Sequence, residues 1–366
     1  AFYNKDGDIA VCKTKDEAIA YFAAQNQSTE NIHQDEDVVD TWFSSWLWPI
    51  TVFDGFKNPE GEVNYYYPTN VLVTGWDIIF FWVARMIIAG YEFKQEMPFK
   101  DVYFTGMVRD RNRKKMSKSL GNSPDSMALI DKYGADGVRF GLLSCSPAGG
   151  DLIFDAPIDP KTKETINESA LCEQGRNFCN KLWNVLRLIK GWEVYEGVNE
   201  ENKVVMNWFE NKMQSVINQS HHNLAQYRIS ETVKDMYIFI WDDFCSWYLE
   251  FIKPEYQQPI DSYTLNKTID YLERICSLLH PFMPFITEEL WHNIKERSGH
   301  DYCIVSKYPA IGEFDASIIE GGELVKELIT AIREVRSKSK LKNSDLVVCQ
   351  YETASAIFQS FEKKIC

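Results

Sequence analysis

Several features are missing from this 366-residue sequence, and each absence excludes a class of protein. No apolar run approaches the roughly 20 residues of a membrane helix, and the N-terminal residues mix charged and aromatic side chains, unlike a secretory signal. The nine cysteines form no Cys-x-x-Cys pair, and the six histidines do not cluster with them into a metal-ligand set. The sequence therefore predicts no membrane association, no structural metal and a reducing, cytoplasmic location.

The composition that remains is that of an ordinary globular chain, with 45% hydrophobic and 25% charged residues and length enough for two or three domains. The net charge of −14 argues against a generally basic surface for nucleic acid, but local clusters decide such binding. Two basic clusters are present, and the second fits either a solvated helix face or an RNA contact. The first contains Arg109, Arg111, Arg113, Lys114, Lys115 and Lys118 around Asp110, and the second contains Lys326, Arg333, Arg336, Lys338, Lys340 and Lys342.

Both ends of the sequence fall inside predicted structure. The chain begins without methionine in a hairpin whose strands we expect at residues 1–3 and 9–12. It stops at Cys366, still within an apolar-periodic segment. We expect the sequence to be a piece cut from a longer protein.

A strand, a helix and a second strand are predicted between residues 71 and 105. The β-branched run at 71–74 predicts a strand, Asp77 begins an apolar stretch that runs to Ala89, and Gly90 is placed to end that helix. Residues 101–105 form the second strand, which completes a parallel, right-handed βαβ unit. The first basic cluster follows the C-terminal end of this strand, where open α/β sheets bind ligands.

From about residue 166 the apolar periodicity is helical almost throughout, which predicts an antiparallel bundle. An aromatic stripe from Tyr237 to Phe251, at spacings of four and three, is assigned to its core. His280, beside two prolines, is predicted to be buried and hydrogen-bonded rather than catalytic. Helices are expected near 170–190, 202–223, 230–252, 262–280 and 285–297, followed by a short strand at 302–305, a basic helix at 320–340 and a strand at 346–349.

The lysine loop, which we define as Lys115-Met116-Ser117-Lys118-Ser119, is the most informative motif. Two lysines on a serine-rich loop suit nucleotidyl transfer, because departing pyrophosphate gathers negative charge that nearby cations stabilise. A solvated basic turn is the alternative. After the loop, Ser123 is expected to cap a helix that starts at Pro124 and ends at Gly134.

The lysine loop resembles the phosphate-handling loop of class I aminoacyl-tRNA synthetases, and five further stretches are similar to the valyl-tRNA synthetase family within that class. The resemblance runs in the family's order from about residue 30 to 300. It implies an enzyme that joins valine to AMP from ATP, supplied with Mg²⁺, and passes it to tRNA(Val). The stretches are residues 40–49, 73–82, 134–140, 177–184 and 280–285.

The resemblance also implies what the sequence does not contain. The family's His-Ile-Gly-His signature and its editing domain are not found in this sequence, so we expect the 366 residues alone not to make valyl adenylate. The fold class is an α/β nucleotide-binding (Rossmann-like) half-domain followed by an all-α helix bundle in a multidomain chain. We expect a re-entry segment after the editing domain at 1–34, the second half of the catalytic fold at 35–165, the anticodon-binding bundle at 166–300 and a small α/β extension at 301–366.

Site residues follow from the same resemblance. It assigns the ATP phosphates and the pyrophosphate to Lys115 and Lys118, with Ser117 and Ser119 holding the loop. It assigns adenine to the backbone of Gly106, Met107 and Val108, and the ATP ribose to Gly75 and Asp77, with the substrate's ammonium group as an alternative partner of Asp77. The amino-acid pocket would be lined by Trp42, Ile78 and Trp82; without the family, both tryptophans would be assigned to the core. A rigid apolar pocket suits a branched aliphatic side chain.

Two positions depart from the family pattern: Arg113 stands where a glycine is usual, and residues 123–126 read Ser-Pro-Asp-Ser in place of Val-Ile-Asp-Pro. Both concern the hinge of the loop rather than its chemistry. Two alternatives stay open, an isoleucyl-type synthetase and a module that only binds tRNA through its bundle and basic clusters.

Overall fold

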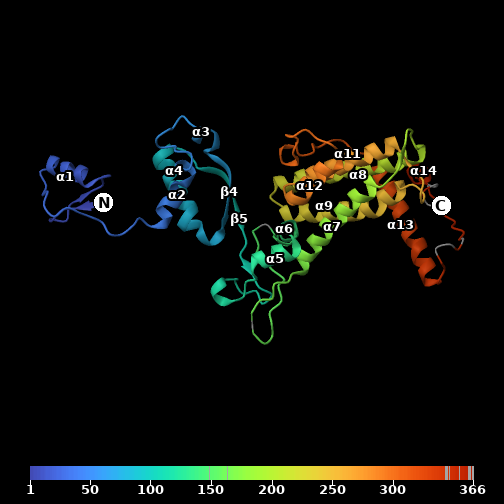
Figure 1. The fold of residues 1–366 in the computed structure, drawn as a ribbon, viewed down its shortest axis with the longest axis horizontal. Coiled ribbons are helices and arrows are strands. Elements are labelled where there is room, and N and C mark those ends of the chain that lie inside the picture. The colour runs from blue at the N-terminus through green and yellow to red at the C-terminus, as the bar shows by residue number, and fades with distance from the viewer. Residues whose placement is uncertain are drawn as a thin grey trace. The chain divides into compact units, whose positions relative to one another are not determined.

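The computed structural model describes residues 1–147, 149–162, 164–342, 345, 347–353, 355–361 and 364, with the backbone alone for Lys118. It forms two compact units, Ala1–Tyr103 and Phe104–Cys366, each of which is treated by itself. Helices dominate the second unit (Figure 1). Among the described residues, no helix is long and apolar enough to span a bilayer.

The predicted N-terminal hairpin is confirmed. Strands β1 (Phe2–Tyr3) and β2 (Ile9–Ala10) pair antiparallel, and β3 (His33–Gln34) pairs with the other edge of β1. Helix α1 (Lys15–Ala24) buries Phe22 against these strands in a small core of its own.

The predicted strand–helix–strand segment of the first unit is also confirmed, with one correction. Strands β4 (Thr69–Gly75) and β5 (Phe99–Thr105) are neighbours, and the amide of Thr69 donates to the carbonyl of Pro98 at 2.9 Å. The two strands therefore start at the same end, as parallel strands do. They are joined by a 3₁₀ turn η1 (Trp76–Ile78), a π-helical turn η2 (Ile79–Val83) and α4 (Ala84–Lys94), while α2 (Thr41–Thr51) and α3 (Val63–Tyr66) precede β4.

Gly90 does not end this helix, contrary to the prediction. It lies inside α4 and is buried, and a Cβ atom there would lie 2.7 Å from the hydroxyl of Tyr67. The helix ends at Lys94, followed by Gln95 in the left-handed conformation at φ 56°. The glycine thus allows close packing rather than a turn.

The second unit begins with a small α/β region. Strands β6 (Val108–Arg109) and β7 (Leu152–Ile153), which the sequence did not reveal, pair in parallel. Between them lie a 3₁₀ turn η3 (Lys118–Leu120), α5 (Ser126–Tyr133) and α6 (Ala135–Ser144). The cap of α5 is Asp125 and not Ser123, because the Asp125 carboxylate accepts from the amide of Met127 at 2.8 Å. Gly134 ends α5 as predicted, at φ 77°.

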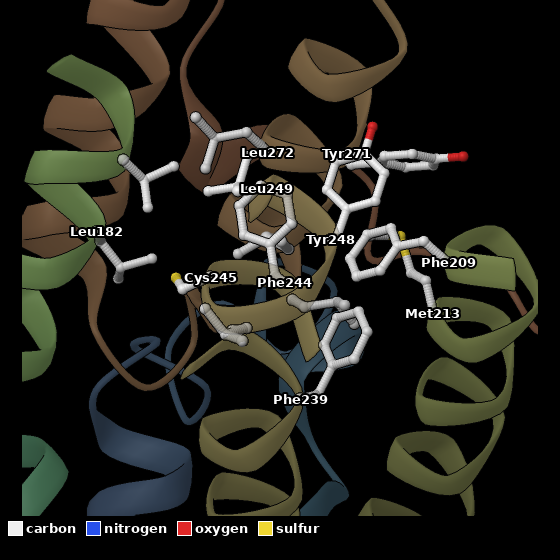
Figure 2. Packing of buried hydrophobic residues seen from close by; sticks show 14 of the residues in the cluster. Leu182, Phe209, Met213, Phe239, Phe244, Cys245, Tyr248, Leu249, Tyr271 and Leu272 are labelled. Atoms are coloured by element: carbon white, nitrogen blue, oxygen red, sulfur yellow. The ribbon is translucent and has the colours of Figure 1, made fainter. Parts of the chain in front are cut away.

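The predicted helix bundle is confirmed, and its core is aromatic (Figure 2). Phe209 lies at its centre, with its ring centroid 4.5 Å from that of Tyr248 and 5.2 Å from that of Phe239. The stripe from Tyr237 to Phe251 packs into this core, over a π-helical segment. The helices are α7 (Ala170–Lys190), α8 (Glu200–Ala225), α9 (Ile229–Ile238) continued by η4 (Phe239–Tyr248) and α10 (Leu249–Ile252), α11 (Ser262–Leu279) and α12 (Pro284–Ile294).

His280 lies in the break between α11 and α12, as predicted. Its side chain is 11% exposed, and its Nδ1 atom lies 2.8 Å from the hydroxyl of Thr287. A short parallel pair, β8 (Val194–Tyr195) and β9 (Ile260–Asp261), ties the loops at the other end of the bundle.

The strand predicted at 302–305 is wrong, since Cys303–Val305 form the 3₁₀ turn η5. The Glu288 carboxylate accepts from the amides of Cys303 and Ile304 at 2.9 and 3.1 Å, and two successive amides aimed at one carboxylate do not fit a strand ladder. The basic helix is confirmed as α13 (Ala316–Lys338), and α14 (Ala356–Ser360) follows it. Of the strand predicted at 346–349, Leu346 lies outside the described residues, and 347–349 are not in a strand.

Candidate functional site

The first unit contains a cavity of about 500 Å³ that brings together the three predicted pocket residues, Trp42, Ile78 and Trp82. Asp40 begins α2 by accepting from the amide of Trp42 at 2.7 Å, and the indole of Trp82 donates to the carbonyl of Ser45 at 3.1 Å. The first bond fixes the backbone of Trp42 at the start of α2, and the second holds the Trp82 indole against that helix. Ser44, Ser45, Trp48 and Thr51 complete the lining.

The cavity has apolar walls. The hydroxyls of Ser44 and Ser45 both donate to the carbonyl of Thr41, at 3.1 and 2.8 Å, so they are engaged within α2. Three indoles and one isoleucine form the rest of the wall together with Thr51, so the wall is suited to an apolar group. Sequence reasoning missed Trp48 and Thr51, although they follow Ser44 by four and by seven residues, which places all three on one face of a helix.

Gly75 and Asp77 lie at the end of β4, next to Ile78 of this cavity. A Cβ atom on Gly75 would lie 2.6 Å from the Asp77 carboxylate, so that carboxylate folds back over the glycine. The end of a parallel strand is where α/β folds bind ligands. The placement is compatible with a polar contact to a ligand, and the assigned role of Asp77 stays a prediction.

In the second unit, residues 108–116 form a tight hairpin that leads into the lysine loop. The amide of Met116 donates to Val108 at 3.0 Å, that of Asp110 donates to Lys114 at 2.9 Å, and Arg109 and Lys115 form an antiparallel bridge. Arg113 sits at the tip with φ 64°. The left-handed conformation explains why a glycine would suit this position.

A buried hydrogen-bonded pair, Asp110 and Asn122, closes this hairpin and the lysine loop together. The Asp110 carboxylate accepts from the Asn122 amide at 3.0 Å and from the backbone amides of Asn112 and Lys114 at 2.9 Å each. The same Asn122 group donates to the Lys115 carbonyl at 3.1 Å, while its oxygen accepts from the Ser117 amide at 2.9 Å. The hydrogen bond from Asn122, together with those from the backbone, holds the pKa of the Asp110 carboxyl below its usual value.

The lysine loop residues lie around this pair. Lys115 is exposed, and the hydroxyls of Ser117 and Ser119 are 3.1 Å apart. The amide of Leu120 donates to the Ser117 carbonyl at 3.2 Å, which arches the chain over residues 117–120. The backbone of Lys118 begins η3, while its side chain lies outside the described part of the chain.

The segment proposed for adenine, Gly106 to Val108, is engaged within the fold. The amide of Met107 donates to the Asp151 carboxylate at 3.0 Å, and its carbonyl accepts from Leu152 at 3.0 Å. A Cβ atom on Gly106 would lie 1.7 Å from the carbonyl of Gly150, so only glycine fits there. Contacts from this segment to a base stay a prediction, and the Met107 amide already has a partner.

The basic clusters are only partly exposed. Arg109 forms an ion pair with Asp151, and Arg111 donates to the Asp155 carbonyl at 2.6 Å. The Asp155 carboxylate accepts from the amide of Ala170 at 2.8 Å, at the start of α7. Thus the hairpin before the lysine loop is joined to the first turn of a bundle helix.

The second cluster needs a correction at Lys326. Its ammonium lies 2.6 Å from the Asp243 carboxylate and 2.9 Å from that of Glu323, and its side chain is 12% exposed. It attaches α13 to the bundle and does not form part of an exposed basic face. Lys338, the last residue of α13, and Lys340, two residues beyond it, are exposed.

A second cavity, of about 730 Å³, lies at the end of the bundle away from the N-terminus of α7. It combines aromatic faces with amide and charged side chains, none of which the sequence singled out. Such a combination suits unstacked nucleotide bases, which need both a ring to stack on and polar groups at their edges. The lining is Leu188, Gly191, Trp192, Glu193, Lys253, Pro254, Glu255, Tyr256, Gln257 and Gln258.

Comparison with known proteins assigns the two regions. Residues 4–155 match the family described as tRNA synthetases class I (I, L, M and V), and residues 206–350 match the anticodon-binding domain of tRNA ligase. The valine–tRNA ligase of Parabacteroides distasonis is 47% identical over 357 residues, which are 96% of this chain and 39% of that protein. That of Phocaeicola vulgatus is 46% identical over 374 residues, 100% of this chain and 41% of that protein.

A solved structure shares the fold. The Agrobacterium radiobacter LeuRS, in a ternary complex with tRNA and LeuAMS, superposes with a TM-score of 0.54 and 19% identity over 88% of this chain and 41% of that chain. The chain spans about two fifths of the length of the curated relatives it matches. Residues 4–155 therefore match the class I tRNA synthetases and residues 206–350 the anticodon-binding domains of tRNA ligases, in a chain that is similar to valine–tRNA ligases over nearly its whole length.

Proposed function

We propose that this chain is part of an enzyme that activates valine with ATP and transfers it to tRNA(Val). The observation that carries the proposal is the identity of 45–47% to valine–tRNA ligases across nearly the whole chain. The lysine loop and the apolar cavity, each in its own unit, supply two of the groups such a reaction needs. A cytoplasmic location is proposed with it, because this reaction serves translation.

In the first step, a carboxylate oxygen of valine bonds to the α-phosphorus of ATP, and the bond from that phosphorus to the bridging oxygen breaks. Pyrophosphate leaves with the electron pair, and Mg²⁺ enters as the counter-ion of the nucleotide. Lys115 and Lys118 have the role of stabilising the charge on pyrophosphate, where fixed cations lower the barrier most. A hydroxyl of the terminal ribose of tRNA then attacks the valyl carbonyl, and AMP leaves.

The valine side chain is proposed to bind in the cavity of Trp42, Ile78 and Trp82. Its apolar walls favour an aliphatic side chain, and one methylene more or less changes binding by only about 1–3 kcal/mol. Engaged serine hydroxyls leave few donors for a polar side chain. Ile78→Ala would enlarge the cavity and shift the preference from valine towards isoleucine.

The bundle is proposed to hold tRNA, with unstacked anticodon bases in the cavity at its end. Trp192 and Tyr256 offer rings for stacking, and Gln257 and Gln258 offer amides for base edges. Affinity for tRNA should fall steeply with salt despite the net charge of −14, because phosphate contacts release counter-ions.

Valine-dependent exchange of pyrophosphate into ATP tests the proposal. The assay uses a chimera of a valine–tRNA ligase. In this chimera, the present chain replaces the segment of the relative to which it is similar. We expect exchange with valine and little exchange with isoleucine. Lys118→Ala should lower the rate of valine-dependent exchange by about 10²-fold or more. A preference for isoleucine would favour the isoleucyl-type alternative, and tRNA binding without any exchange would favour a non-catalytic module.

The 366 residues alone are predicted to give no exchange, and this stays a prediction. Valine-dependent exchange by the isolated chain would contradict it.

A further inference from the structure

We propose that the C-terminal end of α13 is a contact for the phosphate backbone of tRNA, separate from the cavity proposed for the anticodon bases. The inference rests on the proposed function, because it takes tRNA as the RNA that the chain binds. We define the tip as residues 336–342, which read Arg-Ser-Lys-Ser-Lys-Leu-Lys. The tip lies within residues 206–350, which match the anticodon-binding domain of tRNA ligase.

The charge of the tip differs from that of the chain as a whole. The chain has a net charge of −14, whereas four cations and no acid occur between Glu334 and Asp345. Cations placed so close together repel one another, and no acid within the tip offsets this repulsion. A local positive field on an acidic protein suits a ligand with regularly spaced negative charges, and the phosphates of RNA are such charges.

The first half of α13 attaches the helix to the bundle and thereby holds the tip at a defined place. The buried residues of α13 are Gly321, Gly322 and Val325, all in that half. A Cβ atom on Gly322 would lie 2.1 Å from the Cδ1 atom of Trp208, so α13 packs tightly on α8. The ion pairs of Lys326 add a second attachment. From Val325 onward, α13 extends for about 20 Å away from the bundle helices (Figure 1).

The tip forms a closed turn. Lys340 has the left-handed conformation, at φ 55°, and the amide of Leu341 donates to the carbonyl of Arg336 at 3.0 Å. The guanidinium of Arg336 donates to the carbonyls of Lys342 and Asp345, at 2.5 and 2.9 Å. Arg336 is thereby used inside the turn, which leaves the lysines of the tip for contacts outside it. These exposed lysines are Lys338, Lys340 and Lys342.

Stability of the helix alone does not account for the three lysines. A cation near the C-terminus of a helix interacts favourably with the helix dipole, but this effect ends with the last turn. Lys338 lies in that turn, 3.3 Å from the Glu334 carboxylate, in an exposed ion pair that contributes little. Lys340 and Lys342 lie beyond the helix. A phosphate contact explains all three, because each ammonium is a point charge that can neutralise one phosphate.

Such a contact does not read the base sequence. Ammonium groups bound to phosphates supply affinity and orientation, whereas contacts to base edges supply specificity. We therefore expect the tip to strengthen the binding of tRNA(Val) and of other tRNAs alike. Discrimination between tRNAs is left to the cavity at the end of the bundle.

The test replaces the three lysines of the tip by glutamine in the 366-residue chain, in one variant that carries Lys338→Gln, Lys340→Gln and Lys342→Gln. A matched control lowers the net charge equally at three exposed positions of the first unit. It carries Lys13→Gln, Lys15→Gln and Lys57→Gln. In a conservative variant, arginine replaces the same three lysines of the tip and keeps their charge.

Filter binding to tRNA(Val) and to one unrelated tRNA, at several salt concentrations, is the measurement. The glutamine variant should reduce the slope of log affinity against log salt by about 2–3, because each phosphate contact contributes about 0.7–0.9. At about 50 mM salt it should bind both RNAs at least tenfold more weakly. The first-unit control and the arginine variant should keep the slope of the unaltered chain. Circular dichroism should show the same helix content in every variant, because all substituted positions are exposed.

An unchanged slope in the glutamine variant overturns the inference, and so does an equal change in the first-unit control. A loss confined to tRNA(Val) also overturns it, since a backbone contact does not distinguish two tRNAs. Tighter binding of a polyglutamate peptide than of tRNA by the tip lysines would instead indicate an acidic protein partner. The slope is measured without valine or ATP. A chimera without valine-dependent exchange would therefore remove the proposed function without deciding the role of the tip.

Discussion

The carboxylate of Asp136 accepts from the backbone amide of Ile286 at 2.6 Å, across 150 positions of the chain. Asp136 lies in the first turn of α6, and Ile286 in the first turn of α12. Arg139, one turn further along α6, donates to the carbonyls of Phe282 and Pro281 at 3.0 Å each. Two of the stretches that resemble the synthetase family, 134–140 and 280–285, are therefore in direct contact and join the loop-bearing region to the bundle.

Removal of this cap should weaken the joint. Asp136→Ala leaves the N-terminal amides of α12 without their acceptor and is expected to lower the free energy of unfolding by about 1–2 kcal/mol. The carboxylate is 5% exposed, and burial raises its pKa against the opposing pull of the two amide bonds, so water does not readily replace it. Urea unfolding, with Asp131→Ala as the exposed control, measures the difference. An effect no larger than the control's would show that α12 does not depend on this residue.

The hydrogen-bonded pair of Asp110 and Asn122 should make stability depend on pH in acid. The pKa of Asp110 is held below its usual value, so the ionised form stabilises the folded state at pH above about 4, and that contribution is lost as the pH falls through the lowered pKa. We expect the stability difference between the unaltered chain and Asn122→Ala to be full at pH 7 and to shrink steadily below pH 4. Denaturant titrations at a series of pH values give this difference. A stability difference between the two proteins that grows below pH 4 would contradict the prediction that the ionised carboxylate is the stabilising form.

Arg113→Gly should stabilise the hairpin before the lysine loop. A residue with a side chain loses about 1–2 kcal/mol of folding stability in the left-handed conformation of Arg113. Glycine avoids that cost but lowers the stability by about 0.4–1 kcal/mol, because it has more conformational freedom in the unfolded chain. The net expectation is a gain of about 0.5–1 kcal/mol, measured by denaturant unfolding. Arg113→Ala keeps the strain and serves as the control, so equal stability of the two variants would count against the argument.

Substitutions at Lys326 and Lys340 should have different effects: the first should lower folding stability, and the second should weaken RNA binding. Lys326→Met leaves the Asp243 carboxylate buried beside only Lys212, which lies 3.6 Å away, and should cost about 3 kcal/mol of stability. Lys340→Gln, at an exposed position two residues beyond the end of α13, should leave stability within about 0.5 kcal/mol and reduce the slope of log affinity for tRNA against log salt by about 1. Denaturant unfolding measures the two stabilities, and filter binding at several salt concentrations measures the two salt slopes. A lower salt slope in Lys326→Met with an intact fold would reinstate Lys326 as an RNA contact.

Sequence periodicity revealed the elements whose signal is local. The helices of the bundle were found because apolar residues recur at helical spacing, and the aromatic stripe from Tyr237 was found for the same reason. Gly90 and the segment 302–305 were misassigned because their conformation depends on distant partners, the hydroxyl of Tyr67 and the carboxylate of Glu288. No spacing rule predicts such contacts.

The residues of the candidate site were likewise only partly visible in the sequence. The lysine loop was visible as a motif, and family resemblance named Trp42, Ile78 and Trp82, which the structure places around one cavity. Asp110 and Asn122 were not identified, because an acid in a basic run and an asparagine after a glycine have no signal until the hairpin brings them within 3.0 Å. Lys326 was misassigned because charge counts do not reveal the carboxylates facing it.

Helix α7 begins where the Asp155 carboxylate accepts from the Ala170 amide, and it ends at the cavity lined by Leu188 and Trp192. Its 21 residues make a single rod of about 30 Å. The rod therefore fixes the distance between the hairpin before the lysine loop and the cavity at the far end of the bundle. One residue inserted into α7 would turn the far end by about 100° and shift it by about 1.5 Å, so the two regions would change both their distance and their relative orientation.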